Sequence, residues 1–165
     1  MADLRAAAVL SVTLLALTGC TQGSSPTDRR PAERTTTMST SAVRTDREPI
    51  AKRFPQLGDF TTVHWQGSAA GSDNGGVPGP TDVHIQALAV LPPQALASAA
   101  SRYKWKPAPA NWDASLRAEL RPFLPAAGAW QVSDEFAKDV RTARYSGPVY
   151  LDISSGTVFL DVIGR

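Results

Sequence analysis

His64 and His84 are the only histidines in the sequence, and each alternates with apolar neighbours in a short segment. That alternation predicts two strands that carry their imidazoles on the polar face. If the two strands pair, both rings could lie on one face of a sheet and bind zinc together with a carboxylate. The sequence has no H-x-x-x-H or HExxH spacing to demand such a site. We therefore expect two solvated strand histidines, with no metal and no cofactor.

A second group with chemical potential is a stretch in which basic and aromatic residues alternate: Arg102, Tyr103, Lys104, Trp105 and Lys106. Such alternation can stack on sugar rings beside a phosphate, so the matching ligand outside a cell would be a wall glycan or an anionic wall polymer. The simpler interpretation is that Tyr103 completes the apolar stripe of a helix while Trp105 packs into the core. We expect that packing, and the stretch remains the candidate ligand surface.

The sequence carries no motif of a hydrolase. It has no GxSxG elbow, and its single cysteine lies beside the N-terminal apolar run, far from the other candidates. Four aspartates could supply a glycosidase-like pair of carboxylates: Asp73, Asp82, Asp152 and Asp161. Asp152 is expected to accept hydrogen bonds in a turn instead. We therefore expect no enzyme.

The single cysteine closes the apolar run from Ala6 to Leu17. As a helix this run of about 12 residues would measure roughly 18 Å, too short for a hydrocarbon core of about 30 Å. The motif Leu17-Thr18-Gly19-Cys20 resembles the lipobox of bacterial lipoproteins. The resemblance implies that residues 1–19 are a signal peptide and that the Cys20 thiol receives a diacylglyceryl group. The mature chain is then lipid-anchored at the outer face of the cytoplasmic membrane.

Composition divides the rest of the 165 residues into two parts. Residues 20–49 are rich in Thr, Ser and Pro, with few large apolar side chains, which predicts a disordered tether. Residues 50–165 are expected to form a single globular domain. With Cys20 used for lipid, that domain has no cysteine left for a disulfide. A net charge of +2 gives no sign of a nucleic-acid partner.

Strand patterns are clearest at two places in this domain. β-Branched and aromatic residues predict a strand from Thr61 to Gln66, and alternating apolar residues predict another from Asp82 to Leu91. Between them lies a glycine- and proline-rich loop from Gly67 to Pro80. Near the C-terminus, residues 149–153 and 158–162 predict a hairpin. Its expected loop is Ser154-Ser155-Gly156, with Gly156 at positive φ and Ile153 opposite Thr157.

Three helices are predicted between these strands. Pro93 is tolerated in the first turn of the first helix. Asp113 is a candidate N-cap for a second, in which Leu116 and Leu120 face inward. Ser133 is a candidate N-cap for a third. The expected fold class is therefore α+β, an antiparallel sheet of about four or five strands with two or three short helices and a C-terminal β-hairpin.

Two segments carry a further resemblance. The run GPTDVHIQALAVLPPQAL and the hairpin pattern GxVYLDxxSGTVFLDV, together with the lipobox, are similar to small lipoproteins of high-GC Gram-positive (actinobacterial) bacteria. The resemblance implies a membrane address, and it implies no activity.

The function expected from the sequence is a non-catalytic binding or interaction module of the cell envelope. It would hold the membrane through lipidated Cys20 and contact an envelope protein or a wall polymer through Gly67–Pro80 or residues 102–106. Two alternatives stay open. One is a small envelope hydrolase or metal-dependent enzyme that uses His64 and His84, and the other is a structural spacer.

Overall fold

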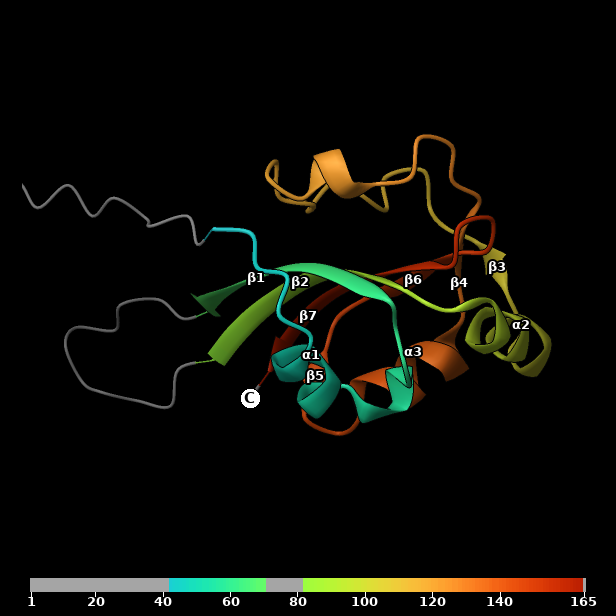
Figure 1. Cartoon of the computed structure of the whole chain (residues 1–165), viewed down its shortest axis with the longest axis horizontal. Helices are drawn as coiled ribbons and strands as arrows, with labels where there is room; N and C mark the ends of the chain where they lie inside the picture. The colour runs from blue at the N-terminus through green and yellow to red at the C-terminus, as the bar shows by residue number, and fades with distance from the viewer. Residues whose placement is uncertain (1–41, 71–81, 165) are drawn as a thin grey trace, which may run out of the picture. The chain divides into compact units, whose positions relative to one another are not determined.

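The computed structural model describes residues 42–70 and 82–164. These residues form one antiparallel sheet of seven strands, three α-helices and two 3-10 helices. The three α-helices lie on one side of the sheet, and the irregular segment 108–129 crosses the other side (Figure 1). The α+β class is confirmed, but the sheet has more strands than the four or five expected.

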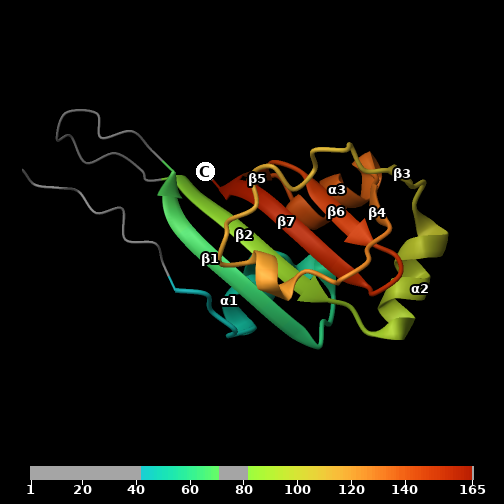
Figure 2. The same cartoon turned by 90° about the horizontal axis from the view of Figure 1, so that it is seen from above.

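Four strands make the body of the sheet, β1 (Thr62–Ala70), β2 (Asp82–Val90), β6 (Val149–Asp152) and β7 (Thr157–Gly164). The order along the sheet is β1-β2-β7-β6-β4-β3, seen from above in Figure 2. The start of the expected Gly67–Pro80 loop belongs to β1, and positions 71–80 lie outside the described residues.

Three further strands account for the difference in strand number. They are β3 (Lys106–Pro107), β4 (Trp130–Val132) and β5 (Tyr145–Ser146). Segments of two or three residues are too short to show an alternating pattern in sequence. They are strands only because β4 pairs with β6, β3 with β4 and β5 with β7.

The C-terminal hairpin forms, but in a register one residue away from the expected one. Asp152 pairs with Thr157, so Ile153 leaves the ladder and the loop has four residues, 153–156. The backbone N–H of Gly156 donates to the carbonyl of Asp152 over 2.9 Å and closes that loop. The Asp152 carboxylate also accepts from the hydroxyls of Ser154 and Ser155. Gly156 has φ +73°, as predicted.

The helices are α1 (Glu48–Arg53), α2 (Pro93–Arg102) and α3 (Asp134–Arg141). The 3-10 helices are η1 (Pro55–Leu57) and η2 (Arg121–Phe123). Pro93 opens α2 and Ser133 caps α3 through a hydrogen bond from the Phe136 N–H, so both predictions are confirmed.

The helix expected after Asp113 is absent from the described structure. This segment instead forms successive turns with i to i−3 bonds, such as Leu116 N–H to the carbonyl of Asp113 and Leu120 N–H to that of Arg117. Prolines on both sides of the segment restrict continuous helical geometry. Leu116 and Leu120 are nevertheless buried, as predicted.

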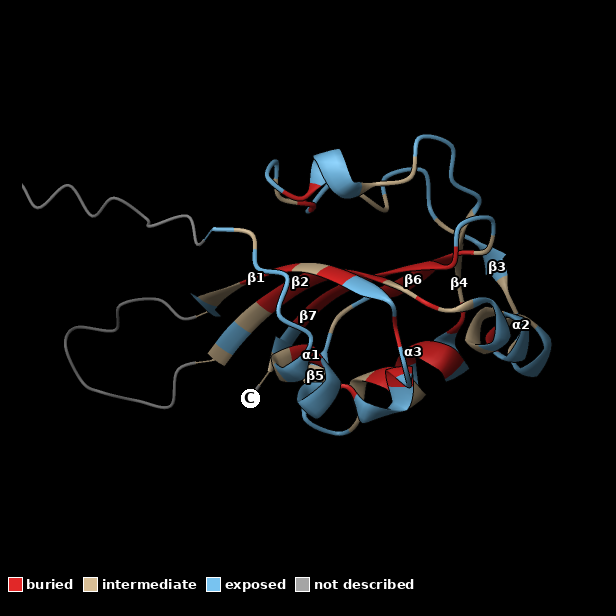
Figure 3. Ribbon diagram, viewed as in Figure 1, coloured by how far each residue is buried: buried red, intermediate tan, exposed pale blue. Residues whose placement is uncertain are grey.

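Buried residues occur in the sheet, in α3 and in segment 108–129 (Figure 3). Their side chains form two separate cores. The larger core lies between the sheet and the helices and is apolar. Its largest members include Phe54, Phe60, Phe136, Ile85 and Leu160. The smaller core lies under segment 108–129. Its buried members are Leu88, Leu116, Leu120, Tyr150 and Phe159.

Residues 42–49, at the end of the expected tether, contribute to the fold. Arg44 and Trp65 exchange two backbone hydrogen bonds of 2.9 Å, and Ile50 in α1 is fully buried. Cys20, the lipobox and the rest of the expected tether lie outside the described residues. Within the described ranges, no helix combines the length and apolar character needed to cross a membrane.

Candidate functional site

The two histidines share one face of the sheet but do not meet. β1 and β2 are paired neighbours, with His64 opposite Leu88 and His84 opposite Ser68. This register places the rings four residues apart along the strands, or roughly 14 Å. His64 stacks on Phe123, with ring centroids 3.8 Å apart. Among residues 42–70 and 82–164, no three His, Cys, Asp or Glu side chains are grouped to hold a metal.

His84 takes part in a partly buried polar network that also includes Asp161 of β7. The Nε2 atom of His84 lies 2.5 Å from Asp161 Oδ1, and the Ser115 hydroxyl donates to Oδ2 over 2.5 Å. The Gln86 amide donates to the same carboxylate over 3.0 Å. Burial raises the pKa of Asp161, but these hydrogen bonds outweigh it and hold that pKa below its ordinary value. Asp161 is therefore an acceptor, and His84 Nε2 carries the hydrogen.

The other ring nitrogen of His84 faces a cation. Arg117 Nη2 lies 3.4 Å from His84 Nδ1 and 2.6 Å from the Ser68 hydroxyl oxygen. A guanidinium can only donate, so in this contact Nδ1 is the acceptor. The His84 side chain is 28% exposed and that of Asp161 is 9% exposed.

This order of groups does not activate a nucleophile. In a serine hydrolase the imidazole lies between the hydroxyl and the carboxylate. Here Asp161 lies between Ser115 and His84. The network instead fastens segment 108–129 to the sheet, because the Gln86 amide bonds the carbonyl of Ser115 at 2.8 Å and the N–H of Arg117 at 2.9 Å.

The aromatic rings of residues 102–106 turn toward the protein interior. Tyr103 and Trp105 both pack against Phe136 of α3, with centroids 5.3 and 5.1 Å apart. The Tyr103 hydroxyl donates to Asp139, and the Trp105 indole donates to the carbonyl of Ala99. The packing interpretation of these two rings therefore agrees with the structure.

The two lysines of the same stretch lie beside an equal number of carboxylates. Lys104 and Lys106 line a small hollow of about 180 Å³ with Asp134 and Glu135. Two cations against two carboxylates give this hollow no preference for an anion.

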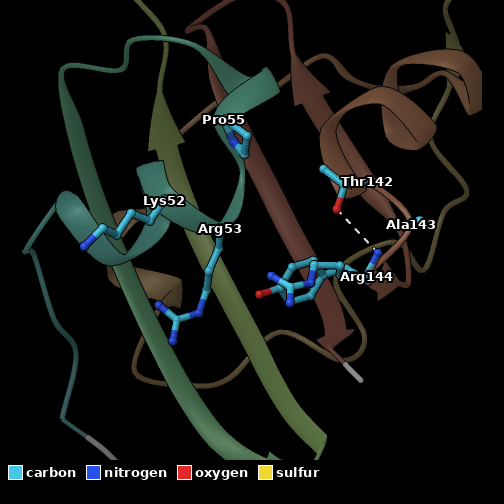
Figure 4. A pocket seen from close by; sticks show the side chains of 7 residues that line it. Lys52, Arg53, Pro55, Thr142, Ala143 and Arg144 are labelled. Atoms are coloured by element: carbon cyan, nitrogen blue, oxygen red, sulfur yellow. Dashed lines mark hydrogen bonds between the residues drawn. The ribbon is translucent and has the colours of Figure 1, made fainter.

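A larger hollow opens between α1 and the turn after α3 (Figure 4). We call it the first hollow. It measures about 750 Å³, and its lining residues are Lys52, Arg53, Pro55, Thr142, Ala143, Arg144 and Tyr145. Arg53 and Arg144 extend from facing walls, whereas Lys52 points outward (Figure 4) and pairs with Glu48 at 2.9 Å. Within the described ranges, the guanidinium groups of Arg53 and Arg144 bind no carboxylate.

The second hollow adjoins the first and shares Thr142 and Ala143 with it. It measures about 520 Å³, and its other lining residues are Gln56, Arg102, Lys138 and Asp139. Arg102 lies 3.7 Å from the Asp139 carboxylate, which also accepts from Tyr103. Together the two hollows form what we call the basic surface.

The charges of the basic surface do not cancel. Its lining holds five cations and one carboxylate. Basic residues near helix C-termini commonly compensate the helix dipole, and both α1 and α3 end here. Glu48 neutralises Lys52, and each helix end supplies only about half a negative charge, so a surplus of about two positive charges remains. Arg141 binds the carbonyls of Ala137 and Gly147, and so serves the α3 terminus without the lining cations.

Thr142, at the junction of the two hollows, has an unusual backbone conformation. Its φ is +58°, and among described residues it is the only non-glycine residue with positive φ. A β-branched residue rarely adopts this conformation, in which glycine would cost less. The tight turn directs the following Arg144 toward α1.

Sequence reasoning missed the basic surface because its cations come from distant segments. They belong to α1, to the end of α2, and to the stretch that runs from α3 into the turn after it, three segments that are far apart in sequence. The basic last turns of α1 and α3 are the sequence signal that could have drawn attention to it.

Comparison of the chain with protein-family models, with curated proteins and with solved structures finds no match.

Proposed function

We propose that this chain is a non-catalytic binding module, anchored by lipid on Cys20 at the outer face of the cytoplasmic membrane. The basic surface is its contact site for an anionic component of the envelope. The observation that supports this proposal is the charge of the two adjoining hollows, five cations against one carboxylate. The chain as a whole carries only +2, so the cations are concentrated at this place.

The ligand chemistry follows from the cations themselves. A guanidinium presents its N–H groups in a planar fork that fits two oxygens of a phosphate or carboxylate. Arg53, which also donates to the carbonyl of Pro49 over 3.1 Å, and Arg144 present their guanidinium groups from facing walls of the first hollow. Phosphate-bearing groups are therefore the expected ligands.

Binding is tested with the full lipidated chain in a non-ionic detergent, titrated with inorganic polyphosphate. Arg53→Gln with Arg144→Gln is expected to weaken binding roughly 25-fold, taking about fivefold for each cation at an anionic ligand. Lys104→Gln with Lys106→Gln removes the same amount of charge from the balanced hollow. This double variant is expected to change the affinity for polyphosphate by less than about threefold. Equal loss in both double variants would show binding by net charge alone and contradict the proposed site.

The anchor has a separate test. Mass spectrometry of the N-terminal peptide should find the diacylglyceryl group on Cys20, and Cys20→Ala should leave the precursor uncleaved. Release of a cleaved, unlipidated chain from the unaltered sequence would contradict the anchor. In-cell crosslinking from Ala143 would then identify what the basic surface contacts.

A further inference from the structure

The basic surface lies on the side of the domain that the chain reaches first. Residues 42–47 lead directly into α1, which forms one wall of the first hollow. The exchange of backbone bonds between Arg44 and Trp65 fixes this entry beside β1. The expected anchor, Cys20, precedes the first described residue by 22 positions. A chain of 22 residues spans at most about 75 Å.

A connection of that length keeps the domain near the membrane but does not determine which side of the domain faces the lipid. Electrostatic attraction can orient the domain only at close range, because the Debye length is about 8 Å at physiological ionic strength. The charge distribution of the domain is suited to such orientation. Cations outnumber carboxylates on the basic surface, whereas the hollow beside Lys104 and Lys106 is balanced.

We propose that the basic surface docks on anionic phospholipid headgroups of the membrane that holds Cys20, and so orients the domain with α1 and the end of α3 toward the lipid. This inference rests on the proposed function and names the ligand of the same site. Two features fit headgroup phosphates. The hollows, about 750 and 520 Å³, lie within the size range that accommodates small ligands. Arg53 and Arg144 offer the forked donors that phosphate accepts.

Docking in this orientation turns the opposite face of the sheet away from the membrane. Segment 108–129 crosses that face (Figure 1). Phe123 in this segment is 41% exposed although it stacks on His64. The lipid would therefore hold the basic surface, and segment 108–129 would face the wall.

The test places single fluorophores on the lipidated chain in nanodiscs. Ala143→Cys labels the basic surface, and Glu119→Cys labels the opposite face; both positions are exposed. Because the chain has one cysteine, and that one is the expected lipid site, each introduced thiol can be labelled alone. Quenching by spin-labelled lipid reports which label lies near the headgroups. Discs of neutral lipid are compared with discs containing phosphatidylglycerol.

The label at position 143 is expected to be quenched at least about threefold more strongly in anionic discs than in neutral discs, and the label at 119 weakly in both. Arg53→Gln with Arg144→Gln should remove the difference, while Lys104→Gln with Lys106→Gln should keep it. Equal quenching of label 143 in the two kinds of disc would overturn the inference, as would stronger quenching at 119.

The polyphosphate titration separates this inference from the proposed function. Polyphosphate binding that depends on Arg53 and Arg144, without orientation on anionic discs, would keep the anion site and assign it to a soluble or wall polymer. Loss of both results would remove the anion site as well. A chain without lipid on Cys20 would overturn the inference together with the proposed anchor.

Discussion

The two faces of the sheet are covered in different ways. On one face the three α-helices bury an apolar core that includes Phe54, Phe136 and Leu160. On the other face segment 108–129 covers a smaller aromatic core and the polar network around Asp161. Backbone groups inside a helix bond one another, so a helix can cover the sheet mainly through apolar contacts. A segment of successive turns leaves backbone groups open, and these need partners from the sheet.

Gln86 shows how the sheet supplies those partners. Its amide bonds the carbonyl of Ser115 and the N–H of Arg117 as a neighbouring strand would. The Asp161 carboxylate fixes the Ser115 side chain beside it. Polar side chains of the strands therefore position segment 108–129. The helices are held mainly by apolar side chains of the strands.

The largest effect is expected on the helix-covered face. Phe136→Ala removes a buried ring that contacts Tyr103 and Trp105, and should lower the free energy of unfolding by about 3–5 kcal/mol. Chemical denaturation of the purified chain measures this loss. A loss below about 1 kcal/mol would show that the 102–106 stretch is not held by this core.

A smaller but more local effect is expected on the other face. Asp161→Asn replaces a carboxylate that accepts from His84, Ser115 and Gln86, and should cost about 2–3 kcal/mol. Amide exchange should quicken in segment 108–129 more than in α3. Asp113→Asn, at a carboxylate 35% exposed and paired with Arg121, is the control and should cost less than about 1 kcal/mol. Uniform faster exchange throughout the domain would contradict a local role.

The polar network around Asp161 also makes the free energy of unfolding depend on pH. The pKa of Asp161 is lowered in the folded state, despite burial, by its hydrogen bonds. A group with a lowered folded pKa stabilises the fold above its unfolded pKa, about 3.9, and this stabilisation is lost as pH falls through the folded pKa. Unfolding free energy should therefore decrease below about pH 4.

Asp161→Asn should flatten that decrease, because it removes one proton taken up on unfolding in acid. Denaturant titrations at several pH values between about 7 and 3 measure how steeply the unfolding free energy changes with pH. Burial raises the pKa of Asp152, but hydrogen bonds from the turn hydroxyls and N–H groups hold it below its ordinary value, so Asp152 should account for part of the remaining slope. Parallel curves for wild type and Asp161→Asn would show that Asp161 does not contribute.

Much of the fold could be predicted from local patterns. β-Branched and aromatic content predicted β1 as far as Gln66, and alternation predicted β2. Pro93 and Ser133 predicted the starts of two helices, and Gly156 predicted the hairpin turn. The register of that hairpin was off by one residue because the Asp152 side chain and the Gly156 N–H extend the loop. Leu116 and Leu120 were assigned correctly to the interior but wrongly to a helix.

The candidate site was harder to foresee for a different reason. The aromatic-basic stretch 102–106 is visible in the sequence, yet its two rings are held inward by Phe136. The cations of the basic surface come from segments that no local pattern connects.

The sequence by itself determined the α+β class, the strand alternation, the apolar side chains that enter the cores and the motif that predicts lipid on Cys20. These depend on spacing between near neighbours, and side-chain periodicity records such spacing. Only the tertiary structure decided which polar groups meet. Asp161 reaches His84 across 77 positions, and Arg53 faces Arg144 across the first hollow. Strand pairing and helix packing bring these groups together, and both are settled by burial over the whole chain.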